Sequence, residues 1–204
     1  MKRVWTAALA GVVAMSLSFS VWAGVKPDQK APGFKLPAAT GKVISLDSFK
    51  GKYVVLEWLN HGCPFVKKHY KSNNMQALQK KFTKKGVVWL SIVSSAPGKQ
   101  GHMSPKKTLK VAKAKGAAAT HILLDPSGKV GKLYGARTTP HMFVLNPKQT
   151  VIYAGAIDSK RGWDPAEVKT AKNYVAAALH AALKGKKVKV KQTPPYGCSV
   201  KYKW

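Results

Sequence analysis

The pattern of apolar and polar positions along the chain predicts strands and helices that follow one another in turn. Residues 53–59 are apolar, β-branched and aromatic apart from Glu57, which is typical of a buried strand. Over residues 63–82 the apolar positions recur at roughly helical spacing with lysines between them, which predicts a helix. A second buried strand is predicted over residues 87–93, after a Lys-Lys-Gly stop.

The other predicted elements are a hairpin at 34–36 and 43–45, a helical turn at 46–49, a helix at 106–115, strands at 121–124, 141–145 and 151–156, and a helix at 164–184. Helices that alternate with strands at this spacing indicate an α/β fold whose sheet is parallel at its centre. The hairpin signal at residues 146–147, Asn-Pro, adds antiparallel strands and makes the sheet mixed.

Residues 1–23 have the organisation of an export signal. Lys2 and Arg3 precede an apolar stretch over 7–21, and small residues follow it. We predict cleavage after Ala23, and an uncleaved membrane anchor is the alternative, although the apolar stretch is short for a span. The chain is therefore expected to be exported, to the periplasm of a bacterium.

The part that follows the signal is long enough for one domain with a full core. We assign residues 24–184 to that domain and residues 185–204 to a basic tail, which becomes Pro-rich before its end. Two cysteines in an exported protein suggest one disulfide or one redox pair, and exclude a disulfide-dense scaffold.

The chain is strongly basic, with a formal net charge of +29. Such a charge raises nucleic acid as a partner, but the predicted export argues against it. The charge is also nearly all lysine, with arginine only at Arg3, Arg137 and Arg161, whereas base readout favours arginine. Because the lysines are spread over the whole chain, we interpret them as a solvated surface, which suits an acidic exterior or an anionic membrane face.

Cys63 is the first candidate for chemistry, because it lies between a predicted strand and a predicted helix. Pro64 fits the first helical turn, where a missing N–H group costs nothing. The free N–H groups and the dipole at a helix N-terminus favour a thiolate, the reactive form in disulfide exchange and peroxide attack. An inert, buried cysteine is the alternative. His61, as an imidazolium, would lower the pKa of the thiol; an exposed turn histidine is the other interpretation of that residue.

Four segments, in this order, resemble the thioredoxin-like superfamily, and more narrowly its redoxin and alkyl-hydroperoxide-reductase-type peroxiredoxin group. They are the strand that leads to residues 60–65 (Asn-His-Gly-Cys-Pro-Phe), residues 138–141 (Thr-Thr-Pro-His) before a strand, residues 153–158 (Tyr-Ala-Gly-Ala-Ile-Asp), and residues 194–202 (Pro-Pro-Tyr-Gly-Cys-Ser-Val-Lys-Tyr). The resemblance implies a thioredoxin-like fold in which the Thr139-Pro140 peptide is cis and faces Cys63. It also implies that Arg137 stabilises the thiolate and the peroxide oxygens.

The chain departs from that group at Asn60. Relatives often have a Cys-x-x-Cys pair in this turn, and Asn60 stands at its first position. Peroxiredoxins of this group have threonine or serine at the same place. A dithiol exchange within the turn is therefore impossible, and a disulfide partner of Cys63 has to be Cys198 or another molecule. Glu57 resembles the buried acid of thioredoxins. The alternative is that its side chain lies on a solvated face of the sheet.

We therefore expect an exported thiol-dependent oxidoreductase with antioxidant or disulfide-exchange activity. The Cys63 thiolate would attack a protein disulfide or a peroxide, and Cys198 or an external thiol donor would resolve the intermediate. No organic cofactor is expected, because the chain lacks a phosphate-cradling glycine motif. Two alternatives remain. One is a redox-inactive binding module. The other is a copper-handling protein, for which the candidate ligands are Cys63, Cys198, His61, His69 and His141.

Overall fold

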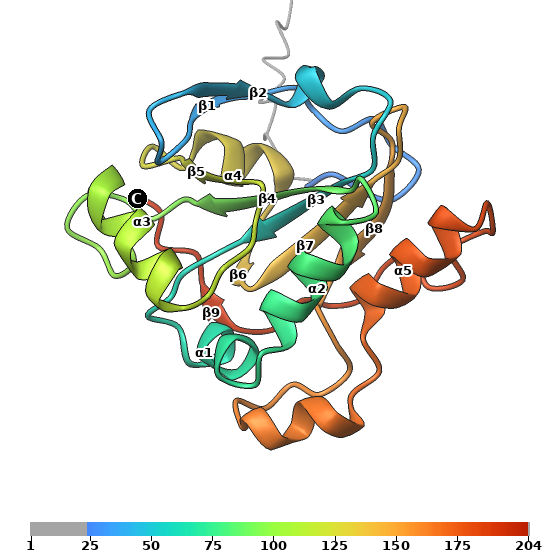
Figure 1. Ribbon diagram of the computed structural model, residues 1–204. Coiled ribbons are helices and arrows are strands. Elements are labelled where there is room, and N and C mark those ends of the chain that lie inside the picture. The colour runs from blue at the N-terminus through green and yellow to red at the C-terminus, as the bar shows by residue number, and fades with distance from the viewer. Residues whose placement is uncertain (1–23, 204) are drawn as a thin grey trace, which may run out of the picture.

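The computed structural model describes residues 24–203, and its centre is a five-stranded sheet (Figure 1). The strands lie in the order β5-β4-β3-β7-β8. Their bounds are Val54–Trp58 (β3), Val88–Val93 (β4), His121–Leu124 (β5), His141–Leu145 (β7) and Val151–Gly155 (β8). Strands β3, β4 and β5 are parallel, whereas β7 is antiparallel to both β3 and β8. This is the mixed sheet with a parallel centre that the sequence predicts.

Helices and a hairpin cover the two faces of this sheet (Figure 1). The hairpin of β1 (Lys35–Pro37) and β2 (Val43–Ser45) lies over one face together with α4 (Lys129–Tyr134). Helices α1 (Pro64–Lys71), α2 (Asn74–Thr83) and α5 (Tyr174–Leu183) cover the other face. Each face has its own apolar core, and all five side chains of β3 are buried between the two layers. The remaining elements are η1 (Leu46–Phe49), α3 (Pro105–Ala114), β6 (Thr138–Thr139), η2 (Pro165–Thr170) and β9 (Cys198–Ser199).

Two predicted helices are each divided in the structure. The helix expected over 63–82 is broken between α1 and α2 at Asn73, whose φ of 57° is left-handed, a conformation that asparagine tolerates better than most residues. The helix expected over 164–184 is a 3₁₀ segment, η2, followed by α5. Ala171 between them is extended, and Asn173 begins α5 by accepting a hydrogen bond from the Ala176 N–H group. Helix α4 was not among the predicted elements.

The tail folds back across the domain. Its backbone runs beside β8, where the Ala154 N–H group donates to the Lys191 carbonyl, and then forms β9. β9 pairs antiparallel with β6, so that Cys198 lies opposite Thr139. Farther on, the Val200 N–H group donates to the carbonyl of Arg137. The tail is therefore packed against the strand that leads into the Thr139-Pro140 peptide.

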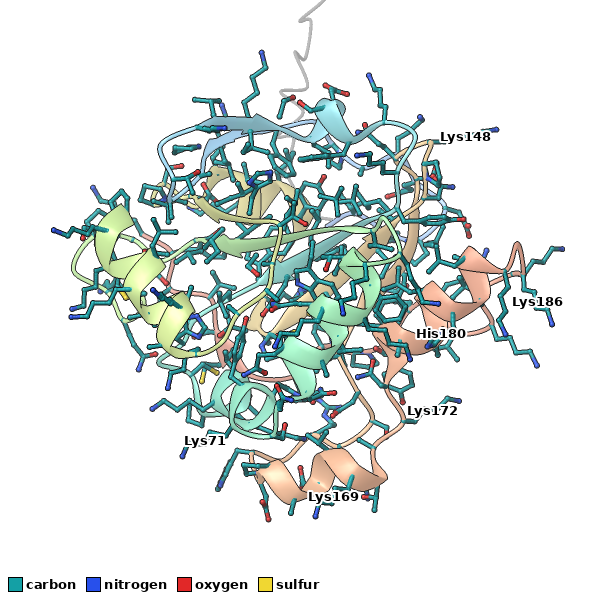
Figure 2. All side chains as sticks on the ribbon, in the orientation of Figure 1. Lys71, Lys148, Lys169, Lys172, His180 and Lys186 are labelled. Carbon is teal, nitrogen blue, oxygen red and sulfur yellow. The ribbon has the colours of Figure 1, made fainter. Side chains whose placement is uncertain are left out.

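Within residues 24–203 no helix is both long and apolar enough to cross a bilayer. The predicted export signal lies outside the described residues. Lysines point outward around the molecule, as Lys71, Lys148, Lys169 and Lys186 illustrate (Figure 2). The distribution agrees with the interpretation of the lysines as a solvated surface.

Candidate redox site

Cys63 is the residue that caps the N-terminus of α1. Its backbone is extended, Pro64 follows as the first helical residue, and the Cys63 carbonyl accepts from the Lys67 N–H group. The side chain is 0% exposed. The sequence therefore placed Cys63 correctly at a helix start, where free N–H groups stabilise negative charge.

Cys63 meets Cys198 and the turn at Thr139. Its sulfur lies 3.0 Å from the carbonyl oxygen of Thr139 and 2.7 Å from the sulfur of Cys198. The Thr139-Pro140 peptide is cis, as the family resemblance implies. The sulfurs are free in this structure; Cys63 is buried and Cys198 is half-buried.

Gly197 makes this approach possible. Its φ of 134° lies in the region that favours glycine, and a Cβ atom there would be 2.2 Å from the Thr139 carbonyl oxygen. A larger residue at this position would push the tail away from the turn. The close approach of the tail to Thr139 therefore requires glycine at the position before Cys198.

The two thiols have opposite pKa shifts. Burial raises the pKa of Cys63, but the side chains of Cys198 and Thr139 and the backbone N–H groups of Val66 and Cys198 outweigh burial and lower it overall. Burial, together with the hydrogen bond to an ionised Cys63, raises the pKa of Cys198 to about 11. When one proton is lost from the pair, Cys63 becomes the thiolate and Cys198 keeps its proton.

Asn60 organises the turn before Cys63. Its amide nitrogen donates to the side-chain and backbone oxygens of Gln100, at 3.1 and 3.3 Å, and its side-chain oxygen accepts from the Gly62 N–H group. The Asn60 carbonyl accepts from the Cys63 N–H group. Asn60, at the place of a first cysteine, thus has a structural part in fixing the turn.

The histidines near the site are neutral. Burial lowers the pKa of His61 to about 4, and its ring packs against Tyr70 with 4.8 Å between centroids. His61 is therefore not the imidazolium that would lower the pKa of Cys63. Burial also lowers the pKa of His141 to about 3, and its Nδ1 atom accepts from the Arg137 N–H group. His141 packs beside the strand, against Phe143.

Arg137 does not have the place that the peroxiredoxin pattern implies. Its side chain is exposed and, with His141 and Phe143, lines a cavity of about 740 Å³ beneath Pro194 and Pro195. Among the described residues no hydrogen bond or ion pair joins Arg137 to Cys63, and Arg137 is not among the groups that shift the pKa of the Cys63 thiol. The expected stabilisation of the thiolate by Arg137 has no support in this arrangement.

A buried polar cluster that the sequence did not reveal lies behind the redox pair. We call it the tail anchor, and it consists of Lys68, His69, Asp158 and Tyr196. The Tyr196 hydroxyl donates to Asp158 Oδ1, and His69 Nε2 lies 3.1 Å from the same hydroxyl. Lys68 Nζ is 3.9 Å from Asp158 Oδ1. The tail anchor joins α1, which begins at Cys63, to the tail, two residues before Cys198.

Glu57 is buried inside β3, as in the thioredoxin-like alternative. It accepts hydrogen bonds from the side chains of Tyr70, Gln79, Trp89 and Ser91. Burial raises its pKa, while those four donors lower it in part. The carboxyl group is held away from solvent, and no hydrogen bond joins it to either cysteine among the described residues.

The candidate copper ligands do not converge. Within residues 24–203 no three His, Cys, Asp or Glu side chains are grouped closely enough to hold a metal ion. His69 instead contacts Tyr196 and Asn74, and His141 contacts Arg137. The two cysteines contact each other, so the geometry favours thiol chemistry.

Comparisons with known proteins agree with the fold. Residues 27–154 match the model of the AhpC/TSA family. No curated protein matches the chain. A crystal structure of an uncharacterized conserved protein from Geobacillus kaustophilus is 28% identical, with a TM-score of 0.76 over 89% of this chain and 94% of the other.

Two more distant structures have the thioredoxin-like fold. One is a putative thiol:disulfide interchange protein DsbE from Chlorobium tepidum, 23% identical, with a TM-score of 0.57 over 78% of this chain and 99% of the other. The other is the peroxidoxin BcpB from Mycobacterium tuberculosis, 21% identical, with a TM-score of 0.56 over 77% and 97%. The prediction of a thioredoxin-like fold with an N-terminal hairpin is confirmed.

Proposed function

This chain belongs to the AhpC/TSA family, and on that basis we propose that it is an exported thiol-disulfide oxidoreductase whose redox pair is Cys63 and Cys198. The observation that carries the proposal is the 2.7 Å distance between the two sulfurs, which are 135 positions apart in the sequence. The pairing of β9 with β6 brings them together, and the tail anchor holds the tail nearby. A two-electron oxidation joins them as a disulfide, and a two-electron reduction releases them.

The roles of the two cysteines follow from burial and charge. The sequence predicts Cys63 as the sulfur that attacks the substrate, but Cys63 is fully buried and in contact with Cys198, so a direct attack requires the residues that cover it to move. In the oxidised pair the accessible sulfur is that of Cys198. A thiolate that attacks Cys198 expels Cys63, whose lowered pKa makes it the better leaving group. In the reverse direction, the Cys63 thiolate resolves a mixed disulfide on Cys198.

Disulfide exchange fits this site better than peroxide reduction. Asn60 replaces the threonine or serine of the peroxiredoxin pattern, and its side-chain amide is hydrogen-bonded to Gln100 and Gly62. Arg137 points into a separate cavity instead of contacting the sulfur. We therefore place a protein disulfide or dithiol first as substrate, with an external thiol as electron donor.

The test is mass spectrometry of the purified protein, with mutational controls. After mild oxidation we expect the intact mass to fall by two hydrogens and a Cys63–Cys198 cross-linked peptide to appear, and dithiothreitol should remove both signals. Cys63→Ser and Cys198→Ser should each abolish the cross-link and insulin-disulfide reduction. If oxidation yields no such cross-link and the protein has no exchange activity, the proposal is wrong. Rapid peroxide consumption with a sulfenic acid at Cys63 would instead support peroxide reduction.

Export is part of the same proposal. The support is the organisation of residues 1–23 in the sequence, and a disulfide pair would persist in an oxidising compartment. N-terminal sequencing of the protein recovered from a periplasmic extract tests it. We expect the mature chain to begin at Gly24, and a chain that retains residues 1–23 in the membrane fraction would support an anchor.

A further inference from the structure

We propose that Phe65 and Trp163 form a docking surface for an acidic, thiol-bearing polypeptide that exchanges with Cys198. This inference rests on the proposed function and names the partner of the same site. A small thiol reaches Cys198 without any docking surface, whereas a polypeptide needs one to hold its own sulfur in place.

The Phe65–Trp163 pair is linked to the tail that carries Cys198. Phe65 is two residues after Cys63, and its ring contacts Tyr196, which is two residues before Cys198. The Phe65 and Tyr196 centroids are 6.0 Å apart, and those of Phe65 and Trp163 are 6.2 Å apart in an edge-to-face arrangement. Aromatic contacts therefore lead from the redox pair out to the surface.

Trp163 lies at the outer end of this series, and its side chain is 68% exposed. A single exposed apolar residue is ordinary on a protein surface. Trp163 differs because the backbone before it is fixed by a fully buried cation. Lys68 Nζ donates to the carbonyls of Lys160 and Gly162, at 2.6 and 3.3 Å.

The same ammonium forms an ion pair with Glu167 at 2.9 Å, on the other side of Trp163 in the sequence. The segment that carries Trp163 is thus held on both sides. A large, amphipathic ring presented at a fixed position costs little entropy on binding, and tryptophan is enriched among residues that dominate interface energies.

Another route for a polypeptide is already occupied. An extended chain binds well by adding to a free strand edge. Here β9 of the tail pairs with β6, the strand that precedes Pro140, and so fills the edge next to the sulfurs. The edge of β6 is therefore taken by the tail, and side-chain contacts with the Phe65–Trp163 pair offer an external chain another way to be held near Cys198.

Charge indicates which polypeptide fits. The exposed residues next to the pair in the sequence include Lys67 after Phe65, and Lys160 and Arg161 before Trp163. Asp164 is an exposed carboxylate after Trp163, and the 32% exposed carboxylate of Glu167 is paired with Lys68. Opposite charge on a partner accelerates encounter and fixes orientation. The surface therefore favours an acidic segment with an apolar residue near its cysteine.

The exchange is balanced in electrons and protons. A thiolate of the polypeptide attacks the Cys198 sulfur, the Cys63–Cys198 bond breaks, and Cys63 leaves as a thiolate. A second thiol of the polypeptide then attacks the sulfur of the polypeptide in the mixed disulfide. Cys198 leaves and takes up the proton of that second thiol. The polypeptide is oxidised to a disulfide, and the Cys63–Cys198 pair gains two electrons.

The test measures reduction of the oxidised, full-length mature protein by three dithiols. Two are synthetic peptides of equal length with Cys-x-x-Cys and one phenylalanine, one flanked by aspartates and one by lysines; the third is dithiothreitol. Second-order rate constants are measured by acid quench and mass spectrometry. The variants are Trp163→Ala and Trp163→Phe, and Val43→Ala is the control because Val43 is 69% exposed on β2, across the sheet from α1.

We expect Trp163→Ala to slow the acidic peptide by about tenfold, which corresponds to loss of one interface anchor. The rate with dithiothreitol should stay within about twofold, Trp163→Phe should recover most of the rate, and Val43→Ala should change nothing. The wild-type protein should be reduced more slowly by the lysine-flanked peptide than by the aspartate-flanked one, and added salt should bring the two rate constants closer together.

Two outcomes would overturn the inference while leaving the proposed function intact. One is an acidic-peptide rate that Trp163→Ala does not change. The other is an equal loss with dithiothreitol, which would mean that the substitution distorts the redox pair. Equal rates for the two wild-type peptides would overturn the acidic character of the partner. A protein that forms no Cys63–Cys198 disulfide would overturn the proposed function itself.

Discussion

Tyr196→Phe is the substitution that most directly tests how the tail is held at the redox site. It removes one oxygen atom and keeps the ring that packs against Phe65. That oxygen donates to Asp158 and lies 3.1 Å from His69 Nε2. Asn74 donates to His69 Nδ1 at 2.9 Å, so the proton of the neutral imidazole is on Nε2 and is donated to Tyr196.

The expected cost follows from what the substitution leaves behind. A hydrogen bond to a charged group contributes about 1.5–3 kcal/mol, and a buried donor without a partner costs about 1–3 kcal/mol. Asp158 keeps the Lys160 N–H group at 3.1 Å, which limits the loss. We expect the free energy of unfolding of the reduced protein to fall by about 3–4 kcal/mol.

The assay is urea denaturation at neutral pH with excess dithiothreitol, so that no disulfide supports the tail. Tyr53→Phe is the matched control, because its hydroxyl donates one hydrogen bond to the backbone carbonyl of Ala182 at 3.0 Å. That substitution should cost only about 0.5–1.5 kcal/mol. In an Asp158→Asn background, Tyr196→Phe should cost clearly less, because the two residues act together.

The result that would refute this reasoning is a cost of Tyr196→Phe no greater than that of Tyr53→Phe. Such a result would mean that the tail anchor contributes nothing to docking of the tail. If Tyr196→Phe lowers the free energy of unfolding equally with and without Asp158→Asn, the Asp158 carboxylate is not the partner of the Tyr196 hydroxyl.

Three further predictions concern the thiols themselves. Thiolate absorbance of the reduced protein against pH should show one midpoint below about 8.5 and a second near 11, because Cys63 ionises first and Cys198 keeps its proton; two midpoints at or above the ordinary value would favour an inert cysteine. Between the lowered pKa of Cys63 in the folded chain and its ordinary pKa in the unfolded chain, the unfolded chain binds more protons, so the stability of the reduced protein should rise with pH in that window. Oxidation should add up to about 4–5 kcal/mol to the free energy of unfolding, because it closes a loop between positions 135 apart; Cys198→Ser should remove the difference, and a gain below about 1 kcal/mol would contradict it.

The sequence predicted those parts of the fold that depend on local patterns. The continuous apolar run of β3 and the Asn-Pro turn before β8 each contain their own signal, and the structure has both where expected. The place of Cys63 as a helix cap was readable from the strand before it and from Pro64 after it. The facing of Cys63 and Thr139 came only from the family resemblance, because the two are 76 positions apart.

What the sequence could not predict depends on burial. Lys68 is one of many lysines and looks like part of a solvated helix face, yet it is fully buried because Asp158, Glu167 and two carbonyls surround it. Tyr196 looked like a turn residue in a Pro-rich tail. A lysine next to the apolar face of α1 and an aspartate at the end of a strand were the available signals, but nothing local joins them.

The position of Cys63 directly after β3 has a topological consequence for the oxidised chain. A bond between Cys63 and Cys198 closes a covalent ring that contains β4, β5, β7 and β8, but not β3. Yet β3 is the central strand and joins β4 on one side to β7 on the other. A ring that closed before β3 was in place would hold two separate halves of a sheet without the strand that connects them. The bond therefore restrains the strands on both sides of β3 without enclosing β3, which is held in the sheet by its ladders to β4 and β7 alone.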